Sequence, residues 1–100
     1  MQQINDLNFQ TEVLGANGMV LVDFGAVWCS PCKRQIPVLE QFASTHPEIK
    51  IVSLDTDDAP NTARQFQIRS VPTLILFKDG QVVKKQVGLT SAKGLEEMVK

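Results

Sequence analysis

Two cysteines, Cys29 and Cys32, are the only ones in this 100-residue chain, and they stand three positions apart. The apolar run 19–24 before them lacks polar alternation, apart from one Asp, and is typical of a strand covered on both faces of a sheet. The segment 33–44 after them repeats apolar residues at helical spacing. We therefore expect the Cys-x-x-Cys pair where a buried strand passes into a helix, which indicates an α/β fold.

A cysteine pair at the start of a helix suits thiol chemistry. The first helical turn presents unbonded N–H groups and the positive end of the helix dipole, and both stabilise a thiolate, the form that attacks disulfides. A purely structural Cys29–Cys32 disulfide would close a loop too small to stabilise the fold much. A zinc site needs about four ligands, but the chain offers these two thiols, carboxylates and the distant His46. We expect His46 to be a solvated loop residue.

The order of the apolar segments predicts a mixed sheet with helices on both faces. We expect a first strand over 2–4, then a short helix capped by Asn5 or Asp6 that carries Leu7. Pro37 should kink the helix after the cysteines. The other expected elements are strands within 49–54, 74–77 and 82–87, a helix opened by Asp57, Asp58 and Pro60, an Asp79-Gly80 hairpin turn, a bulge or close backbone approach at Gly88, and a last helix capped by Ser91.

Asp23 is the charged residue within the apolar strand. In one interpretation it lies at the strand end, in contact with water or capping a turn. In the other it is a buried carboxylate close to the cysteines, and burial would raise its pKa. The sequence leaves both interpretations open.

The composition excludes several classes of function. Ten basic and 11 acidic residues give a net charge of −1, and no basic block is present, so we expect no binding to nucleic acid or to anionic membranes. No apolar run approaches the roughly 18 residues of a membrane span. The start of the chain lacks the basic and apolar regions of a secretory signal. We expect one domain over residues 1–100 and a cytoplasmic location.

Segments along the whole chain match one family. They are Val22-Asp23-Phe24, Trp28-Cys29-x-Pro31-Cys32-Lys33, Pro37, Asp55, Pro60, Val71-Pro72-Thr73, Phe77-x-x-Gly80 and Val87-Gly88. On these residues the chain resembles the thioredoxin family. A lone Cys-x-x-Cys is weak evidence, but the pair with Trp before it, Pro inside it, Asp upstream and Val-Pro-Thr downstream is highly specific.

The resemblance implies a thioredoxin fold, a five-stranded mixed β-sheet flanked by four α-helices. It implies a protein-disulfide reductase that acts on disulfide-containing proteins and is recharged by thioredoxin reductase, a flavoenzyme. No cofactor is implied beyond the redox-active Cys29–Cys32 disulfide, and we expect a monomer. The resemblance further implies a cis peptide bond before Pro72 and a substrate groove lined by Trp28, Val71, Pro72 and Gly88.

For the reaction, we expect Cys29, exposed at the helix start, to attack the substrate disulfide. Cys32, more buried, should then attack Cys29 and release the reduced substrate. Asp23, through a water, should take the proton from Cys32. Pro72 should leave a backbone edge open for an extended substrate segment. The expected supporting residues are Ser30, Pro31 and Lys33.

Three positions depart from the family pattern. Ser30 stands where Gly is usual, which leaves the redox potential open. Gly25 stands where an aromatic residue is common, and Ser53 stands where a Lys often faces the buried Asp. None of these changes removes a reacting group.

Two rival functions remain at this point. The chain could be a redox-switched protein-binding module that uses the groove beside the cysteines, although a non-catalytic relative would usually lack one cysteine. It could also be a glutathione-dependent reductase, although the usual Cys-Pro-Tyr-Cys is absent. Disulfide turnover and the identity of the electron donor separate these alternatives.

Overall fold

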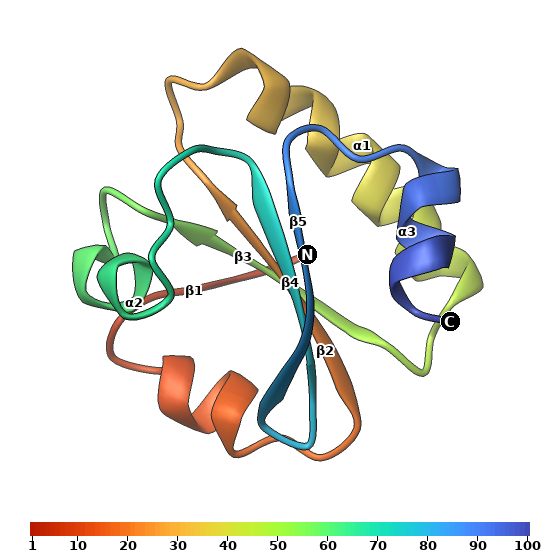
Figure 1. Ribbon diagram of the computed structural model, residues 1–100, viewed down its shortest axis with the longest axis horizontal. Coiled ribbons are helices and arrows are strands. Elements are labelled where there is room, and N and C mark those ends of the chain that lie inside the picture. The colour runs from red at the N-terminus through yellow and green to blue at the C-terminus, as the bar shows by residue number, and fades with distance from the viewer.

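The apolar run before the cysteines forms β2 (Met19–Gly25), the central strand of a five-stranded sheet in the computed structural model, which describes residues 1–100 (Figure 1). β3 (Lys50–Asp55) runs parallel to β2 on one side, and β4 (Thr73–Lys78) runs antiparallel on the other. β1 (Gln2–Ile4) pairs in parallel with β3, and β5 (Gln81–Val87) pairs antiparallel with β4. The sheet order is therefore β1-β3-β2-β4-β5.

Helices cover both faces of this sheet, as Figure 1 shows. α1 (Ser30–Thr45) and α3 (Ala92–Met98) pack on one face, while η1 (Gln10–Leu14) and α2 (Pro60–Gln65) lie on the other. η1 is a short π-helix, whereas the other three are α-helices. The expected mixed five-stranded sheet with four helices is confirmed. None of the helices combines the length and the apolar composition that a membrane crossing requires.

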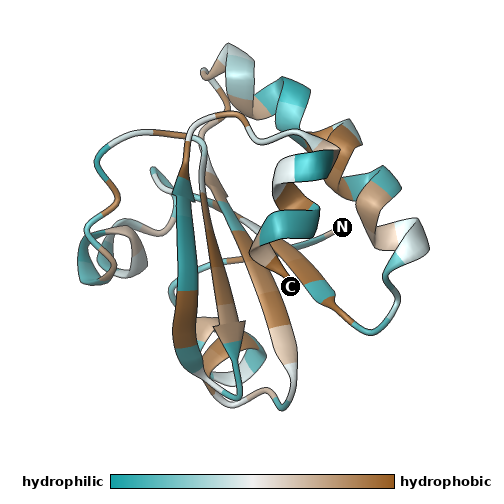
Figure 2. Ribbon diagram, turned by 45° about the vertical axis from the view of Figure 1, so that its right-hand side comes forward, coloured by the Kyte–Doolittle hydropathy of each residue, from teal (hydrophilic) through white to brown (hydrophobic).

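The side chains on the two faces of β2 belong to two separate hydrophobic cores. Side chains alternate along a strand, so Val20, Val22 and Phe24 pack beneath η1 and α2, whereas Leu21 packs beneath α1 and α3. Figure 2 shows apolar strands between helices whose hydrophobic residues alternate with polar ones. The same alternation places Asp23 on the face that α1 covers.

α1 begins earlier than predicted, at Ser30 instead of Lys33. Cys29 caps it and Pro31 lies in its first turn, where the fixed proline φ suits a helix start. The helix continues through Pro37 as one element. Its buried stripe consists of Cys32, Gln35, Leu39 and Phe42.

The prediction for the segment after β1 is partly wrong. Leu7 is 93% exposed and contributes nothing to a core. The Asn5 side chain accepts a hydrogen bond from the Leu7 N–H and so closes a turn instead of capping η1. Asp6 accepts hydrogen bonds from the N–H groups of Asn61 and Thr62, and from the Thr62 hydroxyl, at the start of α2. Chiefly through that hydroxyl, these bonds lower the pKa of Asp6.

The predicted Asp79-Gly80 hairpin is confirmed. Both residues have positive φ, 51° and 82°, as a two-residue turn of this kind requires. The irregularity in the β4–β5 pairing lies at Val83, which has no partner opposite it, and not at Gly88. Gly88, with φ 97°, follows the strand, and its N–H donates to the Pro72 carbonyl at 2.8 Å. No atom lies within 4 Å of where a Cβ at Gly88 would be, so the positive φ, and not a close backbone approach, is what favours glycine here.

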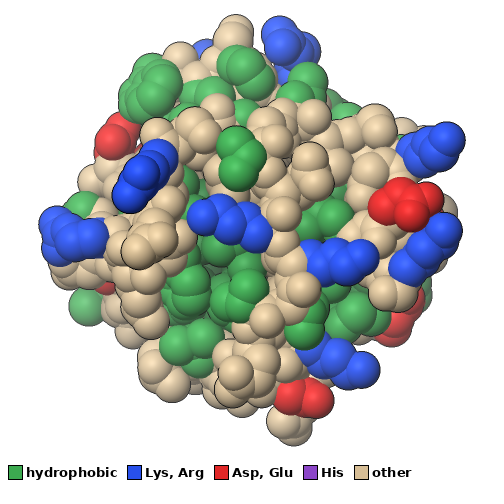
Figure 3. Space-filling view, in the orientation of Figure 1, with side chains coloured by type: hydrophobic (Ala, Val, Ile, Leu, Met, Phe, Trp, Pro, Cys, Tyr) green, Lys and Arg blue, Asp and Glu red, His purple; other side chains and the backbone are tan.

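β5 is an edge strand that is exposed along its whole length. Hydrophobic side chains lie among Lys and Arg side chains on the face shown in Figure 3. On β5 itself, Val82, Val83 and Val87 are about half exposed, and Lys84 and Lys85 stand between them. Lysines and an irregular residue on an edge strand oppose pairing with another sheet.

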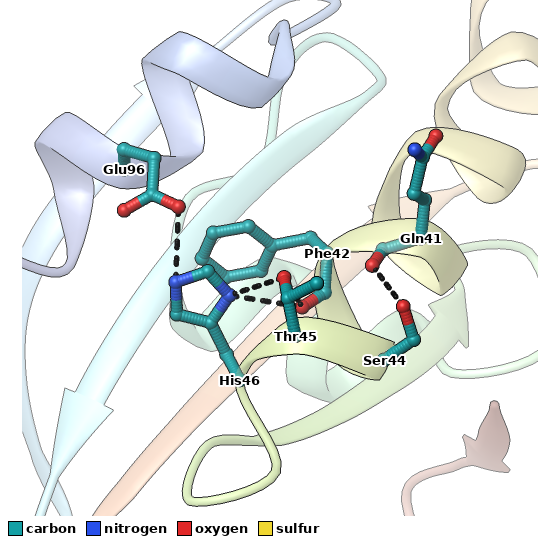
Figure 4. Close-up of polar contacts among 6 residues, drawn as sticks. All are labelled: Gln41, Phe42, Ser44, Thr45, His46 and Glu96. Atoms are coloured by element: carbon teal, nitrogen blue, oxygen red, sulfur yellow. Dashed lines mark hydrogen bonds and ion pairs between the residues drawn. The ribbon is translucent and has the colours of Figure 1, made fainter.

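The prediction that His46 is a solvated loop residue is wrong. His46 caps the end of α1, and its ring stacks on Phe42 with 3.8 Å between centroids (Figure 4). Its Nδ1 lies 3.0 Å from the Phe42 carbonyl oxygen, and its Nε2 lies 3.0 Å from a Glu96 carboxylate oxygen. The side chain is only 17% exposed. His46 therefore links α1 to α3, which brings together residues far apart in sequence.

Candidate active site

A disulfide joins Cys29 and Cys32 at the start of α1, with 5.2 Å between the two Cα atoms. The Cys32 N–H donates a hydrogen bond to Sγ of Cys29 at 3.2 Å, so the Cys29 sulfur serves as the helix cap. The expected difference in exposure is wrong for this oxidised form, because each cysteine is 5% exposed. The two sulfurs differ instead in what surrounds them.

Cys29 faces the loop that precedes β4. Its Sγ lies 3.7 Å from the Val71 carbonyl oxygen. The Val71–Pro72 peptide bond is cis, as the family resemblance implied. Neither the N–H nor the C=O of Val71 makes a hydrogen bond to the backbone. A backbone edge with free donor and acceptor groups therefore lies beside the Cys29 sulfur.

The four predicted groove residues are only partly brought together. Val71 lies beside Cys29, and Gly88 is joined to Pro72 by the 2.8 Å backbone hydrogen bond. Trp28 is 68% exposed, and its indole N–H donates to the Asp57 carboxylate at 2.8 Å. This hydrogen bond attaches Trp28 to the loop after β3. The sequence predicted only a helix start for Asp57 and gave no sign of this bond.

Cys32 faces a different environment, which includes Asp23. Asp23 is 3% exposed, and its Oδ1 has no hydrogen-bond partner. Burial raises the pKa of Asp23 to about 7. The interpretation of Asp23 as a solvated strand-end residue is therefore wrong, and the interpretation as a buried carboxylate is confirmed.

A cavity of about 110 Å³ connects the two groups, because both Asp23 and Cys32 line it. A cavity of this size has room for water. Ser53, in register with Asp23 on β3, lines the same cavity, but no hydrogen bond joins the two side chains. Gly25 leaves the Cys32 sulfur uncovered on this side, since a Cβ at Gly25 would lie 3.5 Å from it. No Lys or Arg lines the cavity, which also contains Gln3, Ile36 and Asp55.

The supporting residues predicted around the pair lie at the helix surface. Ser30 and Lys33 are exposed, and neither side chain makes a hydrogen bond or an ion pair. Pro31 is half-buried within the first turn. No cluster of three or more His, Cys, Asp or Glu side chains is placed to hold a metal ion.

Gln35 is a residue that the sequence reasoning missed. It is fully buried one turn after Cys32, and its amide makes two hydrogen bonds to the backbone of Thr90. The helical stripe that contains Cys32 and Leu39 would have indicated that Gln35 is buried. Nothing in the sequence indicated its partner.

Comparison with known proteins bears directly on this site. A family model described as Thioredoxin matches residues 1–100. The chain belongs to the thioredoxin family. It is 53% identical over 93 residues to a thioredoxin of Mycobacterium tuberculosis, a match that covers 92% of this chain and 78% of that protein. It is 42% identical over 99 residues to a thioredoxin of Chlamydia trachomatis, a match that covers 99% of this chain and 95% of that protein.

A third relative combines two activities in its name. The bifunctional thioredoxin reductase/thioredoxin of Mycobacterium leprae is 48% identical over 93 residues, a match that covers 92% of this chain and 20% of that protein. Membership of the thioredoxin family, together with the Cys29–Cys32 disulfide at the helix start, identifies the chain as a protein-disulfide oxidoreductase.

Proposed function

We propose that this chain reduces protein disulfides, with Cys29 as the attacking thiol and Cys32 as the resolving thiol. The observation that carries the assignment is the hydrogen bond from the Cys32 N–H to Sγ of Cys29 at the helix cap. In the reduced protein, this donor and the helix dipole favour a thiolate on Cys29. The free backbone groups of Val71 beside the same sulfur support its contact with substrate.

The exchange takes place in two steps. First, the Cys29 thiolate attacks one sulfur of the substrate disulfide, so the substrate S–S bond breaks and a Cys29–substrate S–S bond forms. The other substrate sulfur leaves as a thiolate and takes up a proton. Second, Cys32 loses its proton and attacks Sγ of Cys29, which forms the Cys29–Cys32 bond and releases the second substrate thiol. Two electrons thus pass from the cysteine pair to the substrate.

Asp23 accepts the proton of Cys32 in the second step. Both residues line the same cavity, which has room for a bridging water. A general base works best when its pKa lies near the working pH, and burial raises the pKa of Asp23 to about 7. The carboxylate is thus suited to take up a proton at neutral pH and to release it to solvent afterwards.

The substrate binds as an extended segment along Val71. Its backbone pairs with the free N–H and C=O of Val71 in the manner of an added strand. Pro72 and Gly88, joined by their backbone hydrogen bond, form one side of this groove. The exposed Trp28 ring, held by Asp57, forms the other side.

The protein acts as a monomer in the cytoplasm, without a cofactor, and thioredoxin reductase restores its dithiol. The name of the Mycobacterium leprae relative, which joins a thioredoxin reductase to a thioredoxin, supports this donor. The lysines and the irregular residue of β5 oppose sheet-to-sheet pairing and support a monomer. The net charge of −1 without a basic block supports protein substrates over nucleic acid or membranes.

Reduction of insulin disulfides tests this function. With dithiothreitol as the electron source, the wild-type chain should reduce insulin catalytically. With NADPH and thioredoxin reductase as the source, turnover should continue, whereas glutathione with glutathione reductase should support little. Binding of insulin without turnover would indicate a redox-switched binding module, and turnover with glutathione alone would identify a glutathione-dependent reductase.

Alkylation should identify Cys29 as the more reactive thiol. In the reduced protein at pH 7, iodoacetamide should modify Cys29 faster than Cys32, because the thiolate reacts and the helix cap stabilises it on Cys29. Peptide mapping after short reaction times measures the ratio of the two products. Faster modification of Cys32 would reverse the assignment.

A further inference from the structure

A neutral amide lies in the buried stripe of α1, one turn after Cys32. Gln35 is fully buried, and its Nε2 donates to the Thr90 carbonyl at 2.9 Å while its Oε1 accepts from the Thr90 N–H at 2.7 Å. The donor and the acceptor of the amide are both used by the backbone of one residue. In Figure 1, the segment that contains Thr90 leaves β5 and passes across α1 before it enters α3.

The segment between β5 and α3 is attached to the rest of the protein at few points. The backbone of Thr90 makes no other hydrogen bond than the two to Gln35. The Thr90 hydroxyl donates to the Gly88 carbonyl at 3.0 Å, and the Gly88 N–H donates to the Pro72 carbonyl at 2.8 Å. Leu89 between them is about half exposed. Gly88, which follows the paired strand residue Val87, is therefore connected to Pro72 directly and to Gln35 through Thr90.

These bonds form a continuous connection around the cysteine pair. It starts in α1 at Gln35, passes through Thr90 and Gly88 to Pro72, and returns to the helix start, where the Val71 carbonyl oxygen lies 3.7 Å from Sγ of Cys29. An apolar side chain could fill the place of Gln35 in the stripe. A buried amide in this place is tolerated only because both of its hydrogen bonds are made. Unlike an apolar side chain, these hydrogen bonds fix the 88–90 segment in place.

We propose that Gln35 is a positioning residue for substrate binding: its amide holds the 88–90 segment, and with it the Pro72 side of the groove, at a set place relative to Cys29. This inference rests on the proposed function, because the groove is the one that the protein substrate occupies. The Gln35 side chain makes no hydrogen bond to either reacting sulfur. It acts through Thr90 and Gly88.

Replacement of the amide by an apolar chain of similar length tests the proposal. In Gln35→Met, the KM for insulin disulfides should rise about tenfold, as expected for the loss of one or two buried hydrogen bonds. The kcat and the rate with a small aromatic disulfide, which needs no groove, should change less than about twofold. Gln41→Met is the matched control, because Gln41 lies exposed on the same helix and its side chain makes no hydrogen bond.

Amide hydrogen exchange separates positioning from a merely structural role. In folded Gln35→Met, exchange should accelerate at both Thr90 and Gly88, because the second amide depends on the first for its place. An accelerated Thr90 with an unchanged Gly88 and an unchanged KM would overturn the proposal. An equal loss of rate with insulin and with the small disulfide would also overturn it, since the defect would then lie at the cysteines.

A second variant keeps the test available if Gln35→Met does not fold. Thr90→Val removes only the hydroxyl bond to Gly88, and it should raise the KM for insulin in the same direction with kcat unchanged. An unchanged KM in Thr90→Val under those circumstances would overturn the proposal. Failure of the proposed function itself is distinguishable, because wild type would then not reduce insulin at all.

Discussion

Cys32→Ser should accumulate covalent complexes with substrate proteins, whereas Cys29→Ser should form none, and both variants should lose insulin turnover. Without Cys32, the first step still occurs, but nothing attacks the Cys29–substrate bond, so the mixed disulfide persists. Without Cys29, the helix cap has no sulfur and the remaining thiol faces the cavity of Asp23 instead of the groove.

The measurement combines non-reducing gels with mass spectrometry after incubation with a disulfide-containing substrate. The wild-type chain and the double variant Cys29→Ser/Cys32→Ser are the controls, and neither should accumulate a complex. Turnover in both single variants should fall to the background of dithiothreitol alone. Trapping by Cys29→Ser would mean that the two cysteines have the opposite roles.

Asp23→Asn should stabilise the oxidised protein, and the gain should be larger at pH 8 than at pH 5 by about 2–3 kcal/mol. Burial raises the folded-state pKa of Asp23 to about 7, against about 3.9 in the unfolded chain. Between these values, the folded state binds the proton that the unfolded state has lost. The contribution of Asp23 to stability is therefore greatest below pH 4, falls as pH rises toward 7, and levels off above it.

The whole cost of ionising buried Asp23 is on the order of 4 kcal/mol, because about three pKa units separate the folded and the unfolded values. Asparagine is never ionised and escapes this cost. The unpartnered Oδ1 and the cavity without Lys or Arg explain why nothing in the protein offsets it. If Asp23 is the base for Cys32, Asp23→Asn should also slow release of the reduced substrate, within the range of about 10²- to 10⁴-fold that such groups contribute.

Denaturation curves of wild type and Asp23→Asn at pH 5 and pH 8 measure the effect. Asp58→Asn, which removes the same charge from an exposed position, is the matched control. Ser53→Lys is a second test, because Ser53 is in register with Asp23 and lines its cavity, so an ammonium group there should lower the Asp23 pKa. A gain from Asn of equal size at both pH values would contradict the buried ionisation.

Local patterns in the chain were enough to predict the architecture. The run 19–24, apolar apart from Asp23, predicted a central strand, and Asp79-Gly80 predicted the β4–β5 turn. Each rests on the conformational preferences of a few adjacent residues. Cys29 and Cys32 at a strand–helix junction indicated thiol chemistry in the same way, because the two reacting groups are only three positions apart in the sequence. The family came from a resemblance that extends along the whole chain.

Patterns within one segment did not reveal the partners of single polar side chains. Asp6 caps α2, His46 pairs with Glu96, and Trp28 binds Asp57. Each of these pairs joins segments that meet only after the sheet has formed. A polar residue next to a helix predicts a local cap by default, and for Asp6 a distant helix start provided the stronger set of donors.

The amino-acid sequence by itself determined the order of the elements, the cysteine pair at a strand–helix junction and the class of chemistry. Tertiary structure alone decided that both sulfurs are equally buried in the disulfide form, that Asp23 is buried with an unpartnered carboxylate oxygen, and that Gln35 is bonded to the segment beside the groove. The physical reason is that burial and hydrogen-bond partnership depend on which elements pack against a residue. Strand register and helix placement set the burial and the hydrogen-bond partners of a side chain. The residues next to it in the sequence do not determine either property.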